Sequence, residues 1–186
     1  MRIPVLGMDP SMRNWGLAFS HLDLEDGVLD TPTLSLVKTA EEPKGKQVRM
    51  NSYDIEAAET LYSEVLPLAQ KAKVIFIEVP VGSQSAAAMK GYGMCIGILG
   101  AIRATGIPFI EVSEAESKKI MTGKRTATKE EMITAGMAWY PQANWPMHAG
   151  KISAGKAEHM ADAIAAIHAG VQTQQFLNLM RLLKAV

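Results

Sequence analysis

The sequence predicts a single α/β domain whose central sheet has five mixed strands, three antiparallel and then two parallel, flanked by helices. Three short apolar segments with brief connections precede residue 40, which is typical of an antiparallel meander. After that point helical and strand patterns alternate, and such crossovers place the strands parallel. No repeat or linker interrupts the 186 residues, so we expect one domain over 1–186.

The elements follow from the spacing of apolar residues. Strands are predicted at 3–8, 15–22, 33–38, 73–79 and 107–112. Helical spacing predicts helices over 47–72, 83–105, 113–121, 128–139 and 155–170, with an amphipathic tail over 172–184. Two prolines and a glycine predict a loop over 140–154, where Trp145 is expected to anchor the chain.

Two of the helices carry further expectations. In the first, Pro67 is expected to kink or shorten the helix, and the apolar face comprises Ile55, Ala58, Leu61, Tyr62, Val65 and Leu68. The second contains the run G-Y-G-M-C-I-G-I-L-G at 91–100, whose small residues permit close helix contacts. Contacts within one subunit and contacts between two subunits both remain open for this run.

Composition and charge exclude several classes of protein. The chain is 48% hydrophobic and 20% charged, as is ordinary for a globular domain. Its formal net charge of zero excludes a uniformly basic surface but allows a local basic patch for nucleic acid. Cys95 is the only cysteine, so an intrachain disulfide and a cysteine zinc site are excluded. No apolar run matches a signal peptide or a membrane span, which predicts a cytoplasmic protein without a membrane partner.

Two carboxylates stand at the ends of predicted strands. Asp9 stands at the end of the first predicted strand. Glu78 stands at the end of the apolar run in the strand predicted at 73–79. Ligands of open α/β sheets gather at the carboxyl ends of central strands, so neighbouring strands would bring the two side chains together. Paired carboxylates repel unless a cation lies between them, and Mg²⁺ is the hard divalent cation that prefers such oxygen ligands.

The last major helix adds a histidine and a third carboxylate. His159 and Asp162 are three residues apart and therefore share a helix face. Alanines around Asp162 would let the helix lie close on the sheet. Each residue also has a plain structural interpretation: Asp9 as a turn starter, Glu78 paired with a lysine, Asp162 on a solvated face, and His159 as an ordinary polar residue of the first helical turn. All four at the ends of elements of one sheet favour a shared site.

At these residues the chain resembles the RuvC-type Holliday junction resolvases, which have the ribonuclease H-like fold. The first motif is Gly7-Met8-Asp9-Pro10 with Arg13 and Gly16, and the second is the strand 74–78 with Ala86 and Gly93 at matching offsets. The third runs from Ser117-Lys118 through Gly123 and Ala127 to Lys129, and the last is the segment 159–165, H-M-A-D-A-I-A. The motifs occur in order over nearly the whole chain.

The resemblance implies a Mg²⁺-dependent endonuclease, with Mn²⁺ as a substitute, that acts as a homodimer on four-way DNA junctions. Asp9, Glu78, His159 and Asp162 would be both the catalytic set and the metal ligands. Two metals about 4 Å apart would hold the attacking water and the leaving oxygen. Whether His159 binds metal or acts as a base stays open.

A basic stretch and the first loop are the expected DNA contacts. Between Lys118 and Lys129 the sequence has several cations and no acid, which suits contacts with phosphates. A solvated loop is the alternative for this stretch, and Gly16 is expected to let the chain turn into its second strand. The residues expected to contact DNA are Ser11, Arg13, Asn14, Lys118, Lys124, Arg125 and Lys129.

One departure from the family concerns a position shortly after the strand-end glutamate. An aromatic side chain that inserts among bases is common there, and this chain has Val81. The main alternative is another nuclease of the same fold acting on branched or flap DNA or on RNA–DNA hybrids. A non-catalytic junction-binding protein and an actin-like ATP-binding protein are the others. The chain lacks the second phosphate loop of the actin-like proteins and is too short for their duplicated domain.

Overall fold

A computed structural model gives the structure of residues 1–41, 49–80, 82 and 85–184. The main sheet has the strand order β3-β2-β1-β4-β5, with the first two pairings antiparallel and the last two parallel. Its strands are β1 (Arg2–Asp9), β2 (Asn14–Asp23), β3 (Thr33–Lys38), β4 (Val74–Glu78) and β5 (Phe109–Val112). The predicted fold class and strand directions are confirmed.

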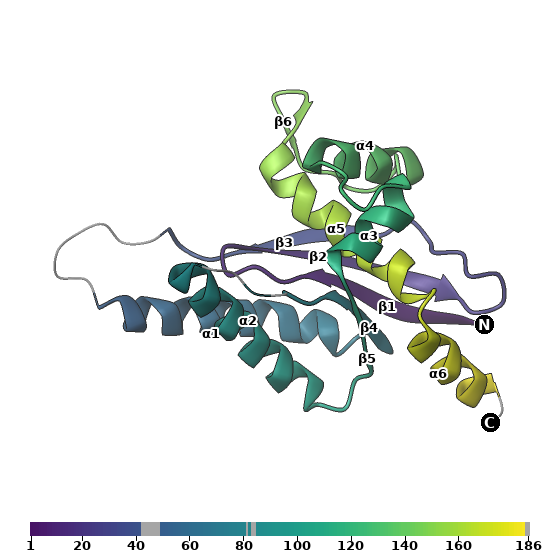
Figure 1. The fold of residues 1–186 in the computed structure, drawn as a ribbon, viewed down its shortest axis with the longest axis horizontal. Coiled ribbons are helices and arrows are strands. Elements are labelled where there is room, and N and C mark those ends of the chain that lie inside the picture. Colours follow the sequence, from purple (N-terminus) through teal and green to yellow (C-terminus); the bar gives the residue numbers. More distant parts are fainter. Residues whose placement is uncertain (42–48, 81, 83–84, 185–186) are drawn as a thin grey trace.

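Helices cover both faces of the sheet (Figure 1). One face packs against α1 (Met50–Ala69) and α2 (Ala86–Arg103). The other packs against α5 (Ala154–Gly170), which is joined by α3 (Glu114–Thr122), α4 (Lys129–Trp139) and the C-terminal α6 (Gln174–Lys184). None of the helices in the described part of the chain is long and apolar enough to cross a membrane.

The central strands are apolar throughout because they are buried on both faces. In β4, Val74 and Phe76 belong to the core under α5, whereas Ile75 and Ile77 belong to the core under α1 and α2. Successive side chains of a strand point to opposite faces, so a strand covered on both sides has no polar face. A continuous apolar run is therefore the sequence signal of β4.

The first helix is rotated relative to the predicted apolar face. Ile55 is 68% exposed, and the buried positions of α1 are Tyr53, Asp54, Ala57, Leu61, Val65 and Ala69. The Asp54 carboxylate lies on this face because Lys90 of α2 forms an ion pair with it at 2.7 Å. Because Asp54 lies on the inner face, the buried face of α1 differs from the one that hydrophobicity alone predicts. Pro67 lies inside α1, and the helix continues to Ala69.

The segment predicted as a loop over 140–154 contains a small hairpin. Its strands are β6 (Met147–His148) and β7 (Lys151–Ile152), paired antiparallel. Ala149 and Gly150 have positive φ angles of 48° and 76°, the backbone conformation that tight two-residue hairpin turns require. Trp145 is only 8% exposed, so its predicted anchoring role is confirmed. Val81 lies outside the described residues.

Candidate active site

Two carboxylates end adjacent parallel strands, as the sequence predicts. Met8 of β1 is paired with Ile77 of β4, so the next residues, Asp9 and Glu78, stand side by side at the carboxyl edge of the sheet. Burial, together with the smaller effect of the nearby Asp9 charge, raises the pKa of Glu78 to about 7. Oε2 of Glu78 is buried and has no hydrogen-bond partner.

Helix α5 lies directly on the backbone of β1 and β2. A Cβ atom at Gly7 would lie 2.0 Å from the carbonyl oxygen of Ala163, and one at Gly16 would lie 2.1 Å from that of His159. Gly16 lies within β2 opposite Asp9, so close helix contact, and not the expected turn, explains this glycine. The two glycines let α5 pack close enough to bring His159 and Asp162 to the edge of the sheet at which β1 ends with Asp9.

Asp162 is the most strongly perturbed carboxyl of this group. Burial, together with the smaller effects of the Asp9 and Glu78 charges, raises its pKa to about 8. The Lys118 ammonium opposes this shift at both Asp162 and Glu78. Without a cation, the three carboxyls therefore do not all ionise at neutral pH.

A chain of polar contacts runs from Asp9 to the protein surface. Nδ1 of His159 lies 2.6 Å from Oδ2 of Asp9, and its Nε2 lies 3.5 Å from Oε1 of Glu158. Glu158 in turn forms an ion pair with Lys129 at 2.8 Å. The sequence analysis missed Glu158, although it directly precedes His159 in the chain.

A cavity of about 240 Å³ opens beside the carboxylates. Its lining is Asp9, Pro10, Ser11, Glu78, Val79, Pro80, Tyr92 and Glu114. Glu114 was also missed by the sequence analysis; it is the first residue of α3 and pairs with Lys118 at 2.5 Å. The cavity thus gives solvent and ligands access to the strand ends.

Two structures of RuvC from Thermus thermophilus resemble this chain, each with a TM-score of 0.63. RuvC in complex with a Holliday junction substrate is 18% identical, with 90% of this chain and 93% of that chain covered. A second RuvC structure is 20% identical, with 96% and 97% covered. The chain has the RuvC fold. No protein-family model and no curated protein sequence matches it.

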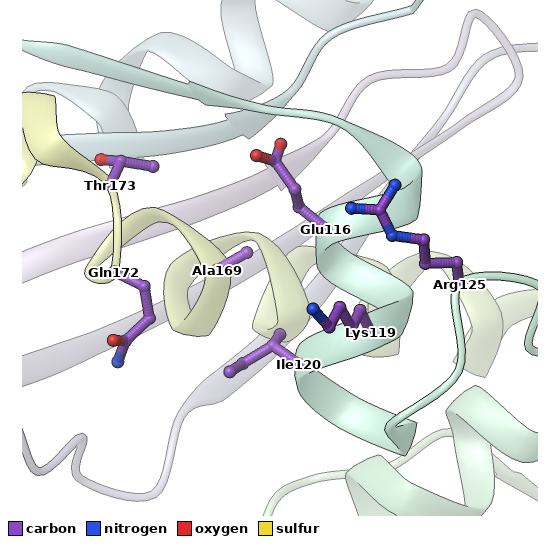
Figure 2. A pocket seen from close by; sticks show the side chains of 7 residues that line it. All are labelled: Glu116, Lys119, Ile120, Arg125, Ala169, Gln172 and Thr173. Atoms are coloured by element: carbon purple, nitrogen blue, oxygen red, sulfur yellow. The ribbon is translucent and has the colours of Figure 1, made fainter.

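On this RuvC fold the predicted basic residues of the stretch 118–129 are dispersed, and Lys118, Lys124 and Lys129 each form an ion pair with an acid. Lys118 lies closest to the carboxylates, whereas Lys124 pairs with Glu131 at 2.5 Å. Arg125 lines a separate cavity of about 370 Å³ between α3 and the end of α5, as Figure 2 shows. The partner acids, Glu114, Glu131 and Glu158, lie outside the stretch 118–129, so the absence of acids within the stretch does not leave these three lysines unpaired.

The three residues around the first loop that were predicted to contact DNA have different surroundings in the structure. Ser11 lines the cavity beside Asp9. The Arg13 guanidinium instead lies 4.9 Å from the ring centre of Tyr53 and donates to the Ala40 carbonyl. Asn14 begins β2 in register with Lys38 of β3. Of the three predicted DNA contacts here, Ser11 is the one beside the carboxylates.

The carboxylates suit a hard divalent cation in their chemistry. Asp9, Glu78 and Asp162 supply oxygen ligands, and the unpartnered Oε2 of Glu78 is a buried acceptor that a cation would satisfy. Within the described residues, no three His, Cys, Asp or Glu side chains are already arranged as a metal site. Because His159 contacts Oδ2 of Asp9, a cation bound at that oxygen would displace the imidazole ring.

Proposed function

We propose that this protein is a divalent-metal-dependent endonuclease that resolves four-way DNA junctions by paired nicks as a homodimer. The supporting observation is the convergence of Asp9, Glu78 and Asp162, with His159, at the carboxyl edge of the sheet in a RuvC fold. The similar RuvC structure in complex with a Holliday junction favours a branched DNA substrate. The same nuclease set on a flap or hybrid substrate is the second candidate.

The chemistry assigned to each residue follows from its surroundings. Bound Mg²⁺, or Mn²⁺ in its place, would polarise the scissile phosphate and make a bound water more acidic. Asp9, Glu78 and Asp162 would hold the cations. His159 sits against Asp9 with its Nδ1 2.6 Å from the carboxylate, which positions the ring to bind metal or to accept a proton from water. Lys118, close enough to lower the pKa of Glu78, would contact a phosphate.

The homodimer assignment is supported by the exposed face of α2. A Cβ atom added at Gly93, Gly97 or Gly100 would meet no described atom within 4 Å, so these glycines serve no contact in the described part of the subunit. Ile96 on the same helix is 50% exposed. A two-fold contact through this face would place two active sites on one junction. Sedimentation equilibrium showing only monomer, with and without junction DNA, contradicts this assignment.

The function is tested by nicking of synthetic four-way junctions in Mg²⁺. The wild-type protein should cut them, whereas Asp9→Asn and Glu78→Gln should lose cutting by at least about a thousandfold and retain binding. Glu59→Gln, an exposed change on α1, is the matched control and should cut normally. Faster cutting of a flap or of an RNA–DNA hybrid contradicts the junction assignment, and normal cutting by Asp9→Asn contradicts the site.

A further inference from the structure

The β6–β7 hairpin projects from the domain between α4 and α5 (Figure 1). Its two strands pair Met147 with Ile152 and His148 with Lys151. Met147 is 57% exposed, and His148 and Lys151 are exposed as well. A two-residue apolar and cationic ribbon in water has little intrinsic stability. Its presence therefore calls for an explanation from its attachment and its surroundings.

The root of the hairpin is firmly attached. The Asn144 side chain accepts from the backbone N–H of Leu34 and donates to the Leu34 carbonyl, at 2.7 and 2.8 Å. Trp145 donates from its indole nitrogen to the Tyr140 carbonyl, and its ring occupies the space beside Gly136. The hairpin is thus held in a fixed orientation.

The hairpin and the start of α5 carry two lysines that have no acidic partner in the described part of the chain, in a segment without acids. No Asp or Glu occurs between Glu131 and Glu158. Lys151 and Lys156 in this interval are exposed, and neither forms an ion pair with any residue that the structure describes. Lys118 and Lys129, by contrast, each have a carboxylate partner. This part of the surface is therefore complementary to a polyanion.

The reach of the hairpin from His159 follows from the lengths of the elements between them. His159 follows the first residue of α5 by five positions, which is about 8 Å along a helix. The tip of the hairpin extends roughly 10 Å beyond that end at the rise of a strand. Since base pairs are spaced by about 3.4 Å, the hairpin reaches DNA roughly two to five base pairs from a phosphate at His159.

We propose that the 146–153 hairpin, together with Lys151 and Lys156, binds the duplex DNA arm that flanks the cleaved phosphate. The inference rests on the proposed nuclease function and adds a second DNA contact to it. A two-stranded ribbon fits a major groove about 12 Å wide and is too broad for the minor groove. The lysines contact phosphates, and the tip of the hairpin, the turn at Ala149 and Gly150, enters the groove. A protein partner fits less well, because lysine is depleted in protein interfaces and Met147 is the one large apolar side chain that the described hairpin exposes.

The first test measures the salt dependence of DNA binding. Fluorescence anisotropy with a four-way junction, in EDTA to prevent cutting, compares wild type with Lys151→Ala/Lys156→Ala. The slope of log K against log salt should become shallower by about two, one for each lost phosphate contact. The control Lys71→Ala/Lys73→Ala makes the same charge change near the opposite edge of the sheet and should keep the wild-type slope. Equal slopes in both double variants overturn the proposal.

The second test locates the contact directly. A photo-crosslinking residue placed at His148 should react with duplex nucleotides roughly two to five positions from the cleaved phosphate. Crosslinks confined to protein, or to DNA far from that phosphate, overturn the proposal. If wild-type protein neither binds nor cuts branched DNA, the proposed function itself fails. If it binds and cuts but the lysine variant keeps its slope, only the hairpin assignment fails.

Discussion

Replacing Asp162 by Asn should stabilise the metal-free protein at alkaline pH. The pKa of Asp162 is raised to about 8 in the folded protein from an ordinary value of 3.8. Between these values the folded chain keeps a proton that the unfolded chain releases. The stability that this protonated carboxyl contributes is complete below about pH 4 and is lost as the pH rises toward 8. Asparagine has no such proton, so its variant should lack this loss.

The size of the effect follows from the raised pKa. Well below pH 8 the free energy of unfolding falls by about 1.4 kcal/mol for each pH unit, and at pH 8 by half of that. Between pH 6 and 8 the sum is about 2 kcal/mol. Glu78 contributes a smaller loss of the same sign, and buried His168, with a pKa of about 4, an opposing gain. The His168 contribution is common to wild type and variant, whereas the Glu78 contribution also changes because its charge interacts with that of Asp162, so the difference between the proteins reports Asp162 together with this interaction.

The measurement is urea unfolding followed by far-ultraviolet circular dichroism at pH 6, 7 and 8 in EDTA. Asp162→Asn should gain about 2 kcal/mol over wild type between pH 6 and pH 8. The control Glu59→Gln, exposed on α1, should follow the wild type. If Asp162→Asn and wild type lose stability in parallel, Asp162 is already ionised in the folded chain and its burial does not act as described.

Three further predictions concern packing, the hairpin root and the metal. Gly7→Ala should lower the free energy of unfolding by at least about 2 kcal/mol, because its Cβ would meet the Ala163 carbonyl at 2.0 Å. Gly93→Ala, where the new Cβ meets no described atom, should raise the free energy of unfolding by about 0.5 to 1 kcal/mol. Urea titrations measure both changes. Asn144→Ala should cost about 2 kcal/mol by the same assay, since both backbone groups of Leu34 lose partners. Mg²⁺ should raise Tm more at pH 8 than at pH 6 in scanning calorimetry, because protons must leave the carboxyls before the cation binds; an equal rise at both values contradicts the site.

The strand ends of this protein could be predicted because their signals are local. Asp9 and Glu78 each follow an apolar run, and the crossover rule makes the two strands neighbours. The face of α1 could not be predicted in the same way. The ion pair between Asp54 and Lys90 joins residues far apart in the sequence, and it turns Ile55 outward.

The contacts of the site depend on the same kind of distant pairing. Lys129 and Glu158 are on different helices, so neither sequence segment reveals that they meet. The hairpin was missed for another reason: its strands have two residues each, too few for alternation to be seen. Its turn uses Ala149 at positive φ, a position where glycine or asparagine is the usual signal.

The contact of α5 with Gly7 and Gly16 has a consequence for how this protein could be improved or damaged. Backbone rests on backbone there, so no side chain can yield to absorb a shift of the helix. Any change that lifts α5 also moves His159 and Asp162 relative to Asp9. Among variants that change the contact between α5 and the sheet, activity and thermal stability should therefore rise or fall together.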